Sequence, residues 1–165
     1  MKKLLIIIVC LTIISSSLFG GGWNNTLIGC RAIAIGGAFA GIADDTSAIF
    51  YNPAGLAFQQ KNFALSINGF NVWPTHEYSD SMGSNLQSKT AFSVPQFFIT
   101  FKTNEKLTLG FGAYTPYAGG GVEWNDSSLG LHLKSYMGII SLTPTLAYQV
   151  NEKLNVGFGL NVFNS

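Results

Sequence analysis

The sequence has few charged residues. Aspartate, glutamate, lysine and arginine make up 10% of its 165 residues, and the formal net charge is only +1, whereas soluble globular proteins carry about 25% charged residues. Such a small charge excludes the extensive basic surface of a nucleic-acid-binding protein. Hydrophobic residues reach 47% and aromatic residues 13%, with 19 glycines. This balance favours a chain that is partly surrounded by lipid.

Cysteine and histidine are also scarce. Cys10 lies in a predicted export signal, so the mature chain would keep only Cys30 and form no internal disulfide. The stretch Leu27-Ile-Gly-Cys30 resembles a lipoprotein acylation box only superficially, because it does not adjoin the apolar run of the signal, and we expect a small buried thiol instead. His76 and His132 are single and far apart. We therefore predict no catalytic residues, no metal site and no cofactor, and we expect that the chain is not an enzyme.

Long hydrophobic runs are absent except at the N-terminus. Lys2 and Lys3 precede the apolar run from Leu4 to Ile14, and three serines follow it. This pattern predicts a signal peptide over residues 1–20, with cleavage after Ser17 or Gly20. The run is shorter than the about 20 apolar residues that span a bilayer as a helix. We expect an exported chain, in which any membrane crossing is made by strands.

Residues 21–60 differ in composition from the rest of the chain. The segment from Arg31 to Leu56 is rich in alanine and glycine, and Gly37 and Gly41 have the spacing that permits close helix packing. We expect a compact buried element. Asp45 or Thr46 is expected to cap one short helix, and Asn52 another, with Pro53 at its first position.

From Lys61 onward, hydrophobic residues alternate with small or polar ones, which is the period of β-strands. We expect five strands, separated by tight turns at 103–106 and 151–153 and by loops at 71–88 and 116–130, with Gly119-Gly-Gly121 as a flexible loop tip. Charges fall in turns, loops or strand ends, away from the middle of the apolar faces. The predicted strands, by their first and last alternating residues, are Phe63–Asn68, Thr90–Lys102, Leu107–Tyr114, His132–Gln149 and Leu154–Val162.

Two features indicate an outer-membrane barrel. Tyr136 and Tyr148 stand on one face of a single strand, about 30 Å apart along the barrel axis at a typical tilt, close to the apolar band between aromatic girdles. The segments 103–113 and 150–160 repeat one hairpin unit, with short turns at one end and longer loops at the other. The alternatives are two unrelated tyrosines in a β-sandwich and turn residues common to any tight hairpin.

Five strands are too few for a closed barrel, because bacterial single-chain barrels have at least eight. An open sheet would leave unpaired backbone groups in lipid. We expect residues 61–165 to be the first strands of a truncated barrel; the alternative is that several copies complete one another.

The segment before the strands contains a family motif. Gly29-Cys-Arg-Ala32, Gly36-Gly-Ala38, Ala43-Asp-Asp45 and Tyr51-Asn-Pro-Ala-Gly-Leu-Ala57 together resemble the N-terminal hatch of the outer-membrane long-chain fatty acid transporter (FadL) family. Asn52, Pro53 and Ala54 match its Asn-Pro-Ala motif. The resemblance implies a fourteen-stranded all-β transmembrane barrel with a small helical hatch inside it. It further implies uptake of long-chain fatty acids or other hydrophobic molecules, hatch rearrangement and lateral exit through a strand kink.

Several residues are candidates for solute contact. Phe39, Phe50 and Tyr51 are expected either to line an apolar pocket or to pack the hatch against the wall. Arg31, the single arginine, is expected either to bind a carboxylate or to form an ion pair with Asp44 or Asp45.

Other residues are candidates for movement. Hinges are predicted at Gly36-Gly37, Asp44-Asp45 and Asn52-Pro53. Gly110 and Gly112 mark either the wall kink or close packing of a strand against the hatch. Asp44 and Asp45 are interpreted as helix caps rather than as an acid or metal pair.

The sequence thus favours an outer-membrane channel for hydrophobic solutes, monomeric when full length and in contact with membrane lipid. The runner-up is a non-transport outer-membrane or secreted β protein with a structural or adhesive role. A lipid-modifying enzyme is a distant third, since no nucleophile-and-base pair is visible.

Overall fold

The computed structural model describes residues 27–79, 81, 85–126 and 131–165. The predicted signal peptide and its cleavage points lie outside these ranges. Within the described ranges, no helix is long and apolar enough to cross a membrane.

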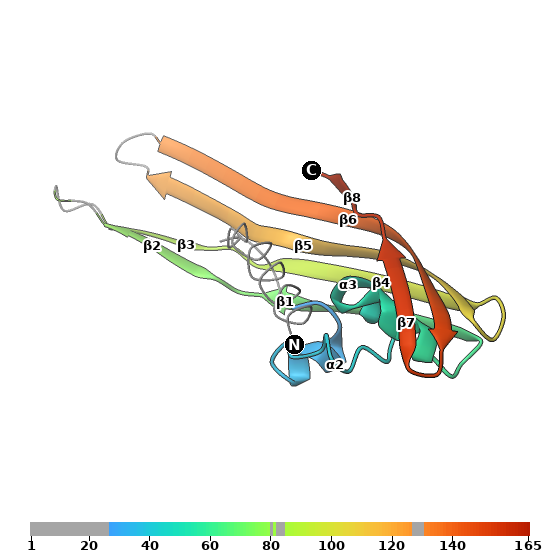
Figure 1. Cartoon of the computed structure of the whole chain (residues 1–165). Coiled ribbons are helices and arrows are strands. Elements are labelled where there is room, and N and C mark those ends of the chain that lie inside the picture. The colour runs from blue at the N-terminus through green and yellow to red at the C-terminus, as the bar shows by residue number, and fades with distance from the viewer. Residues whose placement is uncertain (1–26, 80, 82–84, 127–130) are drawn as a thin grey trace, which may run out of the picture.

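In the part of the chain that the structure describes, three short helices precede an antiparallel sheet (Figure 1). The sheet has the strand order β1-β4-β5-β6-β7, with β8 pairing β6, and β2 and β3 form a separate hairpin. In Figure 1 the β2–β3 hairpin and the long β5–β6 hairpin point to one side, and the short turns lie at the other. The elements are α2 (Cys30–Ala34), α3 (Ala48–Tyr51), η1 (Pro53–Phe58), β1 (Phe63–Val72), β2 (Thr75–Ser79), β3 (Asn85–Lys89), β4 (Phe92–Lys102), β5 (Leu107–Asp126), β6 (Leu131–Asn151), β7 (Leu154–Gly159) and β8 (Val162–Asn164).

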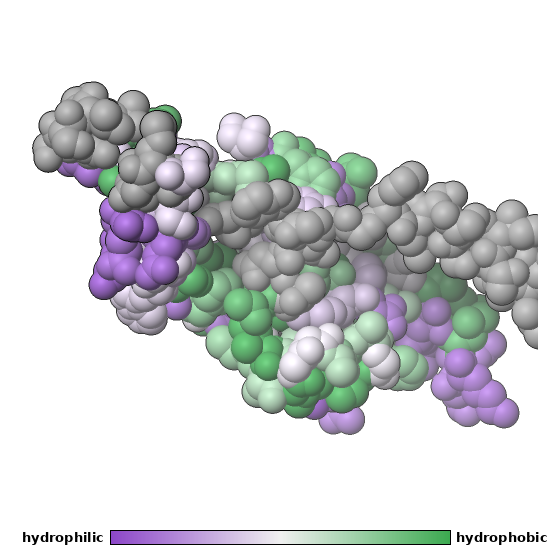
Figure 2. All heavy atoms as spheres, turned by 90° about the vertical axis from the view of Figure 1, so that its left-hand side faces the viewer, coloured by the Kyte–Doolittle hydropathy of each residue, from purple (hydrophilic) through white to green (hydrophobic). Residues whose placement is uncertain are grey.

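The distribution of apolar and polar side chains over the two faces of the sheet is the reverse of that in a soluble protein. We call the face covered by the helices the inner face and the opposite one the outer face. Apolar side chains on the outer face are exposed, and the helices cover polar and small side chains on the inner face. Figure 2 shows a broad hydrophobic area on the surface with hydrophilic patches on either side. The predicted outward face of the strands is therefore confirmed. Exposed outer residues include Phe63, Leu65, Ile67, Phe101, Leu109, Tyr136, Ile140, Leu142, Leu146, Tyr148, Leu154, Val156, Phe158, Leu160 and Val162; buried polar inner residues include Gln96, Thr100, Thr108, Ser141, Thr143 and Thr145.

The predicted fifth strand is confirmed as a single run with one interruption. β7 and β8 pair with β6 in one continuous register, from Gln149↔Asn155 to Ile140↔Asn164. The break falls opposite Pro144, which accepts a hydrogen bond from the backbone N–H of Leu160 but has no N–H to return.

Both predicted long loops are wrong in part. β1 extends to Val72, and the β2–β3 hairpin occupies much of the segment predicted as the first loop. β5 continues to Asp126 and pairs with β6 along its length, so Gly120 and Gly121 lie in a strand rather than at a flexible tip. Two register shifts in β5 interrupt the simple alternation on which the prediction relied.

The helical segment also differs in detail from its prediction. The residue before α3 is Ser47, whose backbone N–H donates to Oδ1 of Asp45, so Asp45 stabilises the preceding turn rather than capping α3 itself. A Cβ atom at Gly37 or Gly41 would meet nothing within 4 Å, so the predicted close packing there is wrong. Cys30, at the first position of α2, is exposed rather than buried as predicted; Ala32 is the buried residue of this helix.

Candidate functional site

The Asn-Pro-Ala motif connects the helical segment to the sheet. Nδ2 of Asn52 donates to the backbone carbonyl of Ala40, 3.0 Å away, instead of capping η1 as predicted. Pro53 lies at the start of η1, as expected. On the sheet side, a Cβ atom built at Gly157 would lie 2.2 Å from the backbone nitrogen of Ala54 and 2.4 Å from the carbonyl carbon of Pro53. The motif therefore touches the inner wall at a point that admits only glycine.

A second glycine joins the two halves of the helical segment. A Cβ at Gly55 would lie 2.1 Å from the carbonyl oxygen of Ala43. Ala43 itself has a positive φ of 35°, an uncommon conformation for alanine. The turn at 43–45 therefore packs directly against Gly55, the residue that follows the Asn-Pro-Ala motif. We name residues 27–58 the hatch.

Gln96 on β4 holds the beginning of the hatch, a role that the sequence did not indicate. Its Oε1 accepts from the backbone N–H of Gly29 at 2.7 Å, and its Nε2 donates to the carbonyl of Leu27 at 2.6 Å. Gln96 is only 2% exposed. A similar buried contact joins Thr100 on β4 to Gln59 at 2.7 Å. In the sequence, the one feature that pointed to these contacts was the position of Gln96 and Thr100 on the inner face of their predicted strand.

A chain of aromatic rings runs from the hatch into the sheet. Ring centroids are separated by 5.5 Å between Phe39 and Tyr51, 4.8 Å between Tyr51 and Phe50, and 5.4 Å between Phe50 and Tyr114. Tyr114 on β5 then stacks on Phe98 on β4 at 5.6 Å. Burial raises the pKa of Tyr51, whose hydroxyl donates to the carbonyl of Ile28. The structure thus brings three of the predicted solute-contact residues together, in the hatch-to-wall packing that was their alternative interpretation.

Arg31 forms the predicted ion pair. Its guanidinium donates to the Asp44 carboxylate, a contact that raises the pKa of Arg31, and Asp45 lies 4.0 Å away. The guanidinium also lies over the ring of Phe39, 5.6 Å from its centroid. About half of each paired side chain is exposed. The carboxylate partner of Arg31 therefore comes from the hatch itself.

Because this ion pair is exposed, we expect Arg31→Gln to lower the thermal stability only slightly. Water and salt screen such pairs. The unfolding temperatures of the variant and the parent, measured in detergent, should converge as salt is raised to about 1 M, where the screening length falls to about 3 Å. A large loss of stability that persists at high salt would contradict this assignment.

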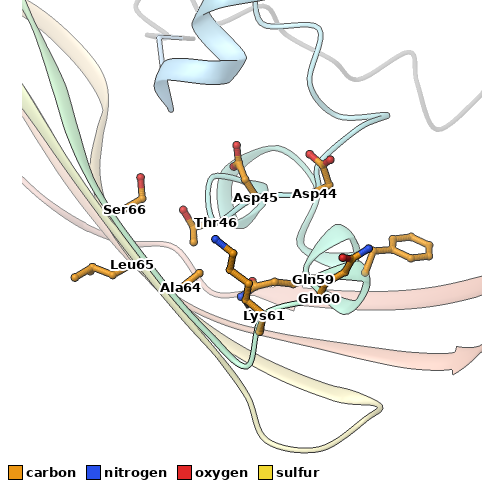
Figure 3. Close-up of a pocket in the computed structure, with 10 residues that line it drawn as sticks. Asp44, Asp45, Thr46, Gln59, Gln60, Lys61, Ala64, Leu65 and Ser66 are labelled. Carbon is orange, nitrogen blue, oxygen red and sulfur yellow. Dashed lines mark hydrogen bonds between the residues drawn. The ribbon is translucent and has the colours of Figure 1, made fainter.

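A cavity of about 510 Å³ lies between the hatch and the edge strand β1. Figure 3 shows the Lys61 side chain reaching toward Asp45 and Thr46, with Ala64 and Ser66 of β1 directed to the same side and Leu65 to the other. Seven of its ten lining residues are polar or charged, so an apolar solute in this cavity would lie beside the charged groups of Asp44, Asp45 and Lys61. No group of three metal-ligating side chains occurs in the described part of the chain.

Gly110 and Gly112 lie in a regular part of the sheet. They pair with Thr145 and Thr143 without a register shift. A Cβ at either would come within 3.1 Å of Ile49, a buried hatch residue. This geometry agrees with the packing alternative rather than with a wall kink.

The irregularity of the wall lies further along β5. Pairing of β5 with β4 ends at Phe97↔Ala113 among the described residues, and its register with β6 shifts twice between Tyr114 and Gly120. Continuing the β4–β5 register would place Val94 opposite Pro116, which has no N–H to donate. We name residues 114–120 of β5 and the facing part of β4 the wall break.

Beyond the wall break, β5 again contacts the chain that precedes β4. The backbone N–H of Glu123 donates to Oγ of Ser88 at 3.0 Å, and the Thr90 hydroxyl donates to the carbonyl of Gly121. Gly120 has a φ of 70°, and a Cβ there would lie 2.1 Å from the ring of Phe92. The wall break is therefore bounded on both sides and partly covered by one aromatic ring.

Comparisons with known proteins agree with this architecture. Residues 14–165 match the family model described as outer membrane protein transport protein (OMPP1/FadL/TodX). The chain is 29% identical over 129 residues to a putative outer membrane protein, NMB0088, of Neisseria meningitidis serogroup B, covering 72% of this chain and 27% of that protein. Its fold is similar to the crystal structure of a Pseudomonas aeruginosa FadL homologue, with a TM-score of 0.51, 19% identity, and coverage of 84% of this chain and 34% of that one. The chain thus spans only about a quarter to a third of these two proteins.

Proposed function

This chain belongs to the OMPP1/FadL/TodX family of outer membrane transport proteins, and we propose that it takes up long-chain fatty acids or other hydrophobic molecules past a movable hatch. It is an outer-membrane β-barrel protein. In this proposal residues 1–20 are the export signal, residues 21–60 contain the hatch, and residues 61–165 are strands of the barrel wall.

The observation that carries the proposal is the hatch on the inner face of an inverted sheet. Lipid surrounds the outer face, so the inner face borders the barrel interior. The hatch meets that face through an apolar cluster, in which hatch residues such as Ile49 and Leu56 pack with Phe98, Tyr114 and Ala147 of the wall. The Gln96 clamp and the close contact at Gly157 add polar and backbone contacts to it.

The wall break supports a lateral route for the solute. An interruption in strand pairing is tolerated at membrane depth where protein covers it. The aromatic chain reaches the wall at Tyr114, where the irregular part of β5 begins. In the proposed mechanism, movement of Phe50 with the hatch changes the packing of Tyr114 and opens a path to the bilayer. Solute is driven along it by transfer from water to lipid.

Binding by the refolded full-length protein tests the proposal. A fluorescent long-chain fatty acid and an alkylbenzene should both bind in detergent with saturable affinity. Cells that express the protein should accumulate at least one of them faster than cells that do not. Absence of saturable binding to any hydrophobic solute would favour the structural or adhesive alternative.

We expect Asn52→Ala to increase leakage through the hatch. The lost hydrogen bond to the Ala40 carbonyl is worth about 1 kcal/mol, which corresponds to a roughly fivefold larger open population. Proteoliposome swelling in a small sugar should therefore accelerate by about that factor. Asn52→Asp, which cannot donate a hydrogen bond, should raise the swelling rate by a similar factor. Asn71→Ala, on the outer face, should leave the swelling rate unchanged. Equal rates in all variants would remove Asn52 from the gate.

A further inference from the structure

Four polar side chains converge on the inner wall beside the wall break. Oδ1 of Asn161 lies 2.8 Å from Oγ1 of Thr143, 3.1 Å from the Tyr114 hydroxyl and 3.4 Å from Oγ of Ser141. Oγ1 of Thr143 also lies 2.9 Å from the Tyr114 hydroxyl and 3.0 Å from Oγ of Ser141. The three hydroxyl residues are nearly fully buried. We name the three hydroxyl residues, Tyr114, Ser141 and Thr143, the hydroxyl cluster.

The hydroxyl cluster fixes the orientation of the Asn161 amide. A carbonyl oxygen is the acceptor end of an amide, so hydroxyl donors direct Oδ1 toward the wall and turn Nδ2 away from them. Asn161 itself is exposed, and the described residues supply no acceptor for Nδ2. Its side chain belongs to the same face as Ser141 and Thr143, which is the inner face of the sheet. Two N–H donors are therefore presented to the barrel interior.

Aromatic rings lie on both sides of this donor group. The ring centroids of Tyr117 and Phe163 lie 5.8 Å apart, and Phe163 pairs directly with Ser141 of the cluster. On the hatch side, Phe50 packs against Tyr114 at 5.4 Å. Few placed polar groups between apolar surfaces are typical of a site that orients a hydrophobic ligand.

We propose that Asn161, held by the hydroxyl cluster, binds the oxygen of the polar end of a hydrophobic solute, while the neighbouring aromatic rings contact its alkyl chain. The inference rests on the proposed uptake function and specifies its solute class, an alkyl chain that ends in an oxygen acceptor. The N–H donors of the Asn161 amide are neutral. The guanidinium of Arg31, by contrast, is paired with the Asp44 carboxylate. Carboxylates and esters share this acceptor chemistry.

The test compares three ligands of equal chain length: a fatty carboxylate, its methyl ester and the alkane. In Asn161→Leu, the affinity of the refolded full-length protein for the carboxylate or the ester should fall about five- to tenfold, as expected for one lost hydrogen bond. The affinity for the alkane should not change. In Asn161→Asp, which keeps the shape and can still accept from the hydroxyls, the carboxylate should lose more affinity than the ester because like charges repel.

Asn155→Leu is the matched control. Asn155 is another inner asparagine of the same run of strand, at β7, and contacts no hydroxyl of the cluster. An equal loss of affinity for all three ligands in Asn161→Leu, or an equal selective loss in Asn155→Leu, would overturn the inference. Unchanged affinities would do so as well. Failure of the unsubstituted protein to bind any of the three would instead overturn the proposed uptake function together with the inference.

Discussion

Replacing Gly157 by alanine is expected to separate the hatch from the barrel wall. The added methyl group would lie 2.2 Å from the backbone nitrogen of Ala54 and 2.4 Å from the carbonyl carbon of Pro53. Backbone atoms cannot rotate aside as a side chain can, so η1 or β7 must shift. Forcing extra atoms into a packed contact typically costs about 1–3 kcal/mol. The shift would also break part of the contact between η1 and β7.

The measurement is thermal unfolding of the refolded protein in detergent, followed together with proteoliposome leakage. Gly157→Ala should unfold at a lower temperature and leak more than the parent. Gly138→Ala is the control, because Gly138 lies on the outer face of β6 and a Cβ there meets nothing within 4 Å. If the two variants have the same stability and leakage, the hatch does not rest on Gly157.

Replacing Gln96 by leucine is expected to release the beginning of the hatch. The substitution removes both hydrogen bonds of the Gln96 amide and leaves the buried N–H of Gly29 without its acceptor. One unsatisfied buried donor and one further lost hydrogen bond together cost about 2–4 kcal/mol. Because this clamp is separate from the Gly157 contact, the two effects should be nearly additive.

Protease sensitivity of the hatch tests this second prediction. Gln96→Leu should be cleaved near the N-terminus faster than the parent while the wall strands stay intact. Gln96→Glu keeps an acceptor for Gly29 and should be intermediate. Gln87→Leu, which removes only an exposed hydrogen bond to Glu77, should resemble the parent. Uniform cleavage rates would mean that Gln96 does not hold the hatch.

Neighbouring residues along the chain accounted for much of the fold. The outward apolar face of β5, from Leu107 to Phe111, was predictable because residue alternation is a local property of an extended chain. The same reasoning failed after Tyr114, where two register shifts remove the strict alternation. It also missed the β2–β3 hairpin, in which few side chains are hydrophobic and the pairing supplies the order.

The candidate site was less accessible to sequence reasoning. The motif Asn52-Pro53-Ala54 was recognised, yet the contact of Asn52 with Ala40 was not, since the amide was expected to cap η1. Gln96 looks like an ordinary polar residue of a strand, and its partner Gly29 lies 67 residues away.

The order of residues was enough to identify the class of protein, because alternation places the apolar side chains on one face of the sheet and the hatch motif is that of the family. The points where the hatch touches the wall, the irregular part of the wall and the donors that face the interior were visible only in the folded chain. The difference lies in the distance along the chain over which each feature acts. Alternation acts between adjacent residues, whereas the contacts at Gly157, Gln96 and Asn161 depend on how a curved sheet brings distant segments together.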